Sequence, residues 1–304
     1  MDFATTLNGI IADDHPLPAA SLTFLSDIPS EHRATLALMW PGIALARRRK
    51  IVATLVTLAE DNIEYDFTTV FGVLLADPDA QVRRLAIEGL VEDESINTVR
   101  RLIGVLDADA DSAVRAAAAN ALGPAALRAE TGKLKGEWPE RLRSALLRAV
   151  RDPAATEEVR RRALESVAYF CANPDVEAEI ARAYGGGSQL LQASAIHAMG
   201  RNMSRRWTPL VLQELHSPEP MLRFEAAQAV GELGERANVP ALLPLLEDDD
   251  LEVQLAAIGA LGQLGGRVAI QALQMLAPEA DATIREAVDE ALMEIRYASD
   301  PLGP

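Results

Sequence analysis

Apolar residues recur along this chain at the spacing of one face of an α-helix. In VRRLAIEGLV from Val82, VRAAAANALG from Val114 and VRRRALESVA from Val159, apolar residues stand one position before and three, four and seven positions after an aligned arginine. Four later stretches repeat this pattern, beginning at Leu191, Leu222, Val253 and Ile284. Such a stripe is typical of an amphipathic helix with one buried face. The pattern therefore predicts seven copies of one helix.

A second, shorter apolar segment precedes the recurring helix, as in SINTVRRLIGVL from Ser95 and NVPALLPLL from Asn238. Turns rich in Asp and Pro, such as ADPD from Ala76 and EDDD from Glu247, separate the two segments. The aligned residues are Arg83, Arg115, Arg160, Gln192, Arg223, Gln254 and Arg285, with spacings of 32, 45, 32, 31, 31 and 31, and Arg48 is a degenerate eighth candidate. The chain is therefore predicted to repeat a helical hairpin.

Four glycines follow the last apolar position of the recurring helix, namely Gly123, Gly200, Gly231 and Gly262. The residue just past a helix often adopts a left-handed conformation, which glycine tolerates without a steric penalty. We therefore expect these glycines to terminate the second helix of their units. Each unit is predicted to consist of a helix, a turn, a second helix and a cap.

These features resemble HEAT repeats, and the 31-residue period is most similar to the bacterial short form named after the phycobilisome lyases. The resemblance covers roughly residues 62–297. It implies an all-α fold, a right-handed α-α superhelix (α-solenoid) of about seven to eight helical hairpins. Solenoids of this kind serve many unrelated tasks, so the resemblance predicts the architecture and leaves the function open.

The turn of most units carries an acidic or hydroxyl residue six positions before the aligned residue. The pairs are Asp77 and Arg83, Asp109 and Arg115, Ser217 and Arg223, Asp248 and Gln254, and Glu279 and Arg285. HEAT-like families use such pairs as a ladder, and the resemblance implies that the Asp caps the second helix and the Arg reaches the carboxylate of its own or the adjacent turn. Ala154 and Gly186 stand at the acidic position before Arg160 and Gln192, so we expect an interrupted ladder in the middle units. We interpret these arginines as structural.

Three regions depart from the repeat. Residues 1–61 do not fit the period and are predicted to form atypical N-terminal capping helices. The 45-residue step predicts an insertion around 124–138, and this insertion overlaps a basic segment, 128–162, in an acidic chain. The insertion is either a longer loop or extra helical turn, or an element that contacts a partner. Residues 298–304 are expected to be a frayed tail.

Composition narrows the classes of partner. The chain of 304 residues is 49% hydrophobic and has a net charge of −16, so no duplex nucleic acid is expected as a partner, because such binding draws on cationic contacts with phosphates. The single cysteine, Cys171, excludes an intrachain disulfide and fits a reducing compartment. We find no secretion signal in the N-terminal sequence and no apolar run long enough for a membrane span. These features predict a cytoplasmic protein without a membrane partner, and they leave the oligomeric state open.

Candidate chemistry is sparse. The four histidines, His15, His32, His197 and His216, lie in no His-Glu pair and at no zinc-ligand spacing, so the iron ligands of the related deoxyhypusine hydroxylases have no counterpart here. The glycine-rich YGGGSQ lacks the Gly-Lys-Ser/Thr of a phosphate loop. We therefore expect no catalytic residue, metal or cofactor. The alternative is a lyase-like or hydroxylase-like enzyme, or a ligand carrier, of the HEAT-like families.

The binding surface is predicted on the second helices, which line the concave face of such solenoids. Positions one, two and five after the aligned residue escape the buried stripe, and Ala116 and Ala117 are expected to be small, open positions there. The candidate partner-binding residues at these positions are Arg84, Arg161, Arg162, His197, Phe224 and Leu255. An apolar spot at Phe224 and Leu255 suits a docking protein or peptide, unless Phe224 packs between neighbouring helices. The sequence thus favours a noncatalytic protein-binding scaffold.

Overall fold

A computed structural model of the chain describes residues 3–11, 19–277 and 281–299. Within these ranges the secondary structure consists of helices and turns without a strand, which confirms the expected all-α class. No helix in the described part of the chain is both long enough and apolar enough to cross a membrane. The chain divides into two compact units, residues 1–166 and residues 167–304, and each is described by itself.

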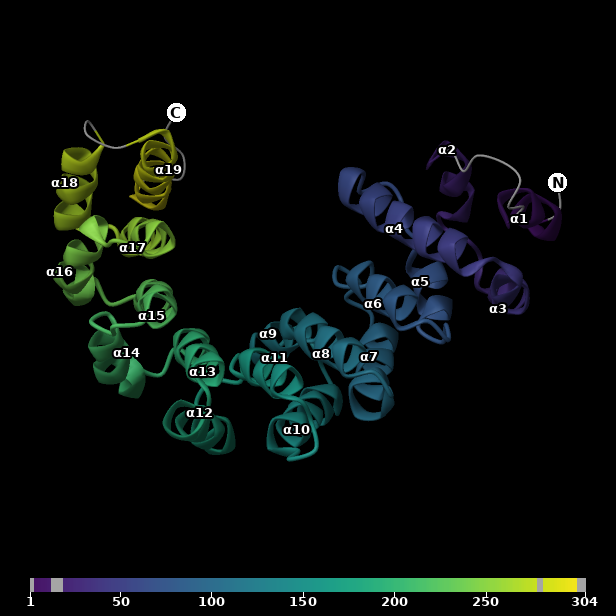
Figure 1. The fold of residues 1–304 in the computed structure, drawn as a ribbon, viewed down its shortest axis with the longest axis horizontal. Helices are drawn as coiled ribbons and strands as arrows, with labels where there is room; N and C mark the ends of the chain where they lie inside the picture. The colour runs from purple at the N-terminus through teal and green to yellow at the C-terminus, as the bar shows by residue number, and fades with distance from the viewer. Residues whose placement is uncertain (1–2, 12–18, 278–280, 300–304) are drawn as a thin grey trace. The chain divides into compact units, whose positions relative to one another are not determined.

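Unit 1 is a stack of helical hairpins preceded by short irregular helices. Its helices are α1 (Phe3–Ile11), α2 (Ala19–Leu22), α3 (Arg33–Met39), α4 (Leu45–Asp61), α5 (Thr68–Leu74), α6 (Ala80–Glu88), α7 (Ile96–Ala108), α8 (Ser112–Ala121), α9 (Gly123–Glu130), α10 (Trp138–Arg151) and α11 (Glu157–Val167). The 3₁₀ turns Thr23–Leu25, Ser30–His32 and Trp40–Gly42 join the first of these helices. α4, α6 and α8 lie side by side as second helices, and α5 and α7 pack against them as first helices (Figure 1).

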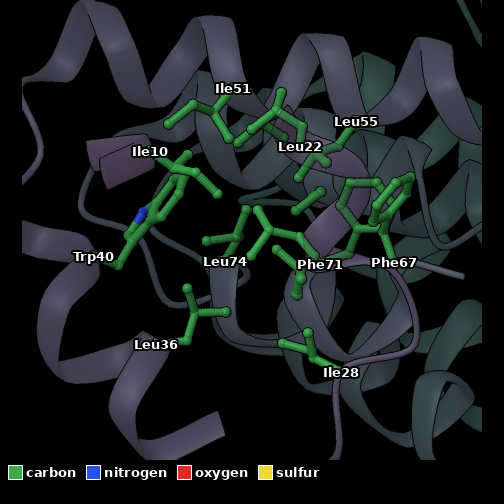
Figure 2. Close-up of a cluster of buried hydrophobic side chains, with 14 of the residues drawn as sticks. Ile10, Leu22, Ile28, Leu36, Trp40, Ile51, Leu55, Phe67, Phe71 and Leu74 are labelled. Carbon is green, nitrogen blue, oxygen red and sulfur yellow. The ribbon is translucent and has the colours of Figure 1, made fainter. Parts of the chain in front are cut away.

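The N-terminal half of unit 1 is held by a hydrophobic core that α4 and α5 share with the helices before them. Figure 2 shows Ile51 and Leu55 of α4 near Phe71 and Leu74 of α5, and none of these four side chains is more than 1% exposed. Complete burial of one such side chain stabilises the fold by about 1.5–3 kcal/mol. The apolar stripe of α4 therefore fixes this helix against the first regular hairpin.

The carboxylate of Asp77 lies buried in this region and is held by two donors. Nη1 of Arg48 and Nε1 of Trp40 each donate to its Oδ2 at 2.5 Å, and the Asp77 side chain is 0% exposed. A buried carboxylate requires such partners because its desolvation is unfavourable. Arg48 thus takes the role of an aligned arginine, and α4 takes the place of a second helix within residues 1–61.

Unit 2 alternates first and second helices with greater regularity. Its helices are α12 (Pro174–Gly186), α13 (Gln189–Asn202), α14 (Thr208–Glu214), α15 (Pro220–Leu233), α16 (Val239–Leu242), α17 (Leu251–Leu264), α18 (Gly266–Leu276) and α19 (Ala282–Ser299), with 3₁₀ turns at Arg205–Trp207, Arg236–Asn238 and Leu243–Glu247. The second helices α13, α15, α17 and α19 lie side by side, and we call them the inner row (Figure 1). α12, α14, α16 and α18 flank this row on one side.

Close helix approach in the inner row is permitted by glycine. A Cβ atom placed on Gly200 would lie 2.8 Å from the Cα atom of Ala229, and one on Gly231 would lie 3.1 Å from the Cα atom of Ala260. Gly262 stands in the same relation to the following helix, at 3.0 Å from Ala291. These glycines therefore let each second helix touch the backbone of the next.

The predicted glycine caps are wrong. Gly200, Gly231 and Gly262 lie inside α13, α15 and α17, and Gly123 is the first residue of α9. The residues that follow these three inner-row helices with a positive φ are Met203 (54°), Gly234 (72°) and Gly265 (61°). The helices run about three residues further than the apolar stripe suggests because their last turns pack against the neighbouring second helix.

The ladder of arginines and aspartates joins each helical repeat to the next. Nε and Nη2 of Arg83 donate to both carboxylate oxygens of Asp109, at 2.8 and 2.7 Å, and Nη1 donates to the carbonyl oxygen of Asp77 at 2.8 Å. Arg223 binds Asp248 in the same way, at 2.7 Å for both bonds, and a carbonyl oxygen of its own turn at 2.9 Å. The pKa of Asp248 lies below its ordinary value chiefly because Arg223 donates to it. The guanidinium therefore takes its carboxylate from the next turn and its carbonyl from its own.

The helix caps stand two positions after the ladder aspartates, so the predicted capping role is wrong. Asp79, Asp111 and Asp250 accept N–H bonds at the starts of α6, α8 and α17. The ladder residue Asp77 instead accepts the N–H of Asp79 at 2.7 Å. The Asp77 side chain thus binds Arg48 of the preceding repeat and the backbone of its own turn. It lies too far from the first residue of α6 to cap that helix.

The middle of the ladder is altered rather than simply interrupted. Nη2 of Arg115 contacts Asp152 at 3.4 Å, and its Nε donates to the carbonyl oxygen of Leu106 at 2.9 Å. Asp152 stands two positions before Ala154, so the longer turn supplies a carboxylate that the alignment does not place there. Nε of Arg160 is buried and has no hydrogen-bond partner among the described residues.

In the last repeat, the aligned arginine contacts the turn before its own helix. Nε of Arg285 donates to the carbonyl oxygen of Ala277 at 3.5 Å, and Glu279, its expected partner, lies outside the described residues. α19 continues to Ser299, so the predicted tail of 298–304 begins two residues too early, and residues 300–304 lie outside the described part of the chain.

The insertion around 124–138 is largely helical. It forms α9 and a turn in which Gly132 and Gly136 both have φ near 72°. Arginines in and beside it form ion pairs, namely Arg128 with Glu94, Arg141 with Glu137, Arg143 with Glu140 and Arg148 with Asp107. Much of the basic charge of segment 128–162 is therefore neutralised within unit 1.

Candidate partner-binding surface

The inner row presents fewer open positions than the helical period suggests. Ala193 and Ser194, one and two positions after the aligned residue of α13, are each 2% exposed, and Ala256 of α17 is 8% exposed. In unit 1, Ala116 is 6% exposed, which contradicts the expectation of an open position, and Ala117 is half-buried. Neighbouring second helices approach closely enough to cover these small residues. Several of the positions predicted to be open are therefore covered.

Phe224 is an aromatic side chain of the inner row that remains partly accessible on α15. It is half-buried on α15, and with Pro220 and Met221 it lines a shallow hollow closed on the other side by Asp250 and Glu252 at the start of α17. Asp250 is engaged in capping α17, whereas the Glu252 side chain is exposed. Phe224 is thus neither fully open nor fully buried, and its accessible part lines the hollow.

Leu255 lies on the next helix and is also half-buried, but it does not line the hollow. The structure does not bring Phe224 and Leu255 together there. Met221 takes the place expected for Leu255, because a residue three positions before Phe224 shares its helix face. The alignment could have identified Met221 from this spacing.

A group of charged side chains lies on the same row. Nδ1 of His197 on α13 lies 3.0 Å from Oε2 of Glu225 on α15, and both side chains are about one-fifth exposed. Nη1 of Arg201 donates to the hydroxyl of Tyr169 at 2.6 Å and the guanidinium lies over that ring. Burial raises the pKa of Glu232, an effect that His197 and Arg201 oppose. His197 therefore binds another residue of the inner row, Glu225, which follows Phe224 in the sequence.

The cationic candidates of unit 1 differ in their availability. Arg84 is exposed on α6 and forms no ion pair with the described residues. Arg161 and Arg162 each pair with Glu158, at 3.0 and 2.8 Å, and Arg162 also pairs with Glu165 at 3.0 Å. Their charge is thus compensated within α11, and Arg84 carries the free charge.

Three of the four histidines lie in the described part of the chain. The ring of His32 stacks on Phe3, His197 pairs with Glu225 and His216 is exposed, while His15 lies outside the described residues. Among the described residues no group of three His, Cys, Asp or Glu side chains is placed to hold a metal ion. The inner row carries an apolar hollow with an acidic side.

Comparisons with known proteins agree with this architecture. Residues 208–293 match the family described as HEAT repeats, and the comparison with curated proteins finds no match. The crystal structure of Kap121p bound to Pho4p is similar with a TM-score of 0.53 and 16% identity, over 95% of this chain and 37% of that one. Human deoxyhypusine hydroxylase gives a TM-score of 0.38 and 18% identity, over 88% of this chain and 97% of that one.

The chain thus spans little more than a third of Kap121p, and at this identity the likeness concerns the fold alone. The repeat period, the ladder from Arg48 to Asp77 onward, the inner row and the match of residues 208–293 all agree. Together they show a HEAT-like repeat architecture, in which residues 208–293 match the family described as HEAT repeats.

Proposed function

We propose that this protein is a noncatalytic scaffold that binds a protein or peptide on the inner row of unit 2. The observation that carries the proposal is the hollow in which Phe224 and Met221 meet the acidic start of α17. Aromatic side chains that are partly buried and ringed by polar groups commonly anchor a partner. The fixed helices of the row provide a surface that needs little ordering on binding.

The similar solved structures support protein binding in general terms. Kap121p was crystallised bound to Pho4p, to Ste12p and to Nup53p, with TM-scores to this chain of 0.53, 0.52 and 0.51. At least one protein with this fold therefore binds other proteins. A noncatalytic role is further supported by the sequence, in which no histidine is followed by glutamate as in the related hydroxylases.

Site-specific photo-crosslinking tests the proposal. p-Benzoylphenylalanine replaces Phe224 in one protein and Met275 in a matched control, since Met275 is 80% exposed on α18 and lies outside the inner row. After irradiation in the native cell, we expect a defined protein adduct at position 224 and none at position 275. The same adduct at both positions, or none at position 224, contradicts the inner-row assignment.

Elemental analysis separates the proposal from its enzymatic alternative. A hydroxylase-like protein holds its metal stoichiometrically, and a pigment carrier copurifies with visible absorbance. We expect neither in the purified chain. Stoichiometric iron in the purified protein would contradict the noncatalytic assignment.

A further inference from the structure

Unit 1 contains an open hollow whose character differs from that of the hollow at Phe224. It has a volume of about 610 Å³ and lies between the end of α4, the loop to α5, and the turn after α6. Its floor is apolar and includes Val56, Tyr65, Phe67, Phe71 and Val91. This volume falls in the range that accommodates small ligands or a few side chains. We call it the acidic groove.

Its rim carries five carboxylates, from Glu60, Asp66, Glu88, Glu92 and Asp93, and no basic side chain lines it. Asp66 and Asp93 accept N–H bonds in the adjoining turns. Glu60, Glu88 and Glu92 are exposed, and the described residues offer them neither an ion pair nor a side-chain hydrogen bond. Three uncompensated negative charges therefore surround an apolar floor.

Two of these charges oppose local helix stability. Glu60 lies in the last turn of α4, and Glu88 is the last residue of α6. A helix C-terminus carries partial negative charge, so an acidic side chain there is unfavourable and a basic one is favourable. Neither last turn contains a basic residue. A bound cation at this place would relieve the repulsion at both helix ends.

The apolar part of the groove is open to a partner. Ile63, in the loop between α4 and α5, is 98% exposed and lines the groove. Gly89 leaves room for the Phe71 ring of the floor, because a Cβ atom on Gly89 would lie 2.4 Å from that ring. Ile63 and the apolar floor line the same hollow, and an apolar patch rimmed by polar residues is a feature of contact surfaces. It gives the groove a second, uncharged means of recognition.

A bare metal ion fits the groove poorly, because no three of its described carboxylates converge on one point. An extended ligand with separated positive charges matches the separated carboxylates better. We propose that the acidic groove binds a basic peptide segment of a partner protein, in which an apolar side chain contacts Ile63 and the floor while flanking Lys or Arg residues pair with Glu60, Glu88 and Glu92. This surface is independent of the inner row.

Fluorescence anisotropy with two labelled probes tests the proposal. The probes are the peptide Lys-Arg-Lys-Leu-Lys-Arg-Lys and its counterpart with Gly in place of Leu. The rim variant is Glu60→Gln/Glu88→Gln/Glu92→Gln. Its matched control, Glu286→Gln/Asp289→Asn/Glu290→Gln, changes the net charge equally at exposed residues of α19. We expect the rim variant to weaken binding of the Leu probe about tenfold or more, and the control to change it less than about twofold.

The contribution of the apolar contact is tested separately with Ile63→Ser, which alters a side chain that unit 1 does not bury. This change should weaken the Leu probe and leave the Gly probe unaffected. The rim variant should also melt at the same or a higher temperature than the native protein, since it removes charge from two helix C-termini. Equal weakening by the rim and control variants, or equal affinity of both probes for the native protein, overturns the proposal.

Discussion

The close approach of the inner helices rests on glycine, and substitution by alanine tests this directly. In Gly200→Ala, the new methyl group would lie 2.8 Å from the Cα atom of Ala229 and 2.5 Å from Oε2 of Glu232. The glutamate oxygen can move, but the backbone of α15 cannot move without separating the two helices. Gly259→Ala on α17 is the matched control, because no atom lies within 4 Å of its Cβ position.

The two substitutions should change the free energy of unfolding in opposite directions. Replacing glycine by alanine within a helix stabilises by about 0.5–1 kcal/mol, so Gly259→Ala should be more stable than the native protein by that amount. Gly200→Ala gains at most the same stabilisation from helix propensity, and overpacking lowers its free energy of unfolding by about 1–3 kcal/mol. The difference between the variants therefore isolates the packing contribution, about 1–3 kcal/mol. Gly262→Ala and Gly231→Ala, with backbone contacts of 3.0 and 3.1 Å, should lie between them.

Urea unfolding monitored by circular dichroism measures the difference, since the midpoint changes while the slope should not. We expect the midpoint of Gly200→Ala to fall below that of Gly259→Ala. If Gly200→Ala is as stable as Gly259→Ala, the inner helices are not held in contact at this glycine, and the explanation for the mistaken caps fails.

Two further predictions concern single interactions. Arg223→Ala should destabilise the protein by about 1–3 kcal/mol, because it leaves Asp248 without its paired donor, whereas Arg205→Ala, at a side chain 87% exposed, should change stability by less than about 0.5 kcal/mol in the same urea assay. Burial and a hydrogen bond to Glu214 raise the pKa of Tyr184 to about 12, so the stability from the protonated phenol should be complete below pH 10 and lost as the pH rises toward 12. In a difference titration by ultraviolet absorbance, Tyr184→Phe should remove the tyrosine that ionises near pH 12, and loss of a phenol with an ordinary pKa would contradict this environment.

The repeat period could be predicted because it depends on the spacing of residues that are close in sequence. The apolar stripe and the aligned arginines reflect contacts that every unit repeats, so Arg83 and Arg223 occupy equivalent environments although 140 positions separate them. The residue that receives each arginine was harder to assign. Asp152 stands off the period because the turn before α11 is longer, and only the folded chain brings it to Arg115.

The glycines and the open positions required tertiary information. Gly231 and Gly234 are both near the end of α15, and the sequence alone does not tell which one touches a neighbour and which one adopts a positive φ. The same limit applies to Ala116, which is buried because an adjacent helix covers it and not because of its place on its own helix. Likewise, the pairing of Arg161 with Glu158 removes a free charge that the sequence assigns to the surface.

We propose that Phe224 anchors a protein partner on the inner row, and a comparison of affinities measures its contribution. The partner identified by crosslinking at position 224 is titrated against the native protein, Phe224→Ala and Met275→Ala, with the melting temperature of each variant measured in parallel. Loss of an aromatic anchor typically removes about 2 kcal/mol or more of binding free energy, which corresponds to roughly a thirtyfold weaker complex. We predict this loss for Phe224→Ala in a protein that remains folded, and unchanged affinity for Met275→Ala. Equal affinity of the native protein and a folded Phe224→Ala variant would show that Phe224 does not anchor the partner.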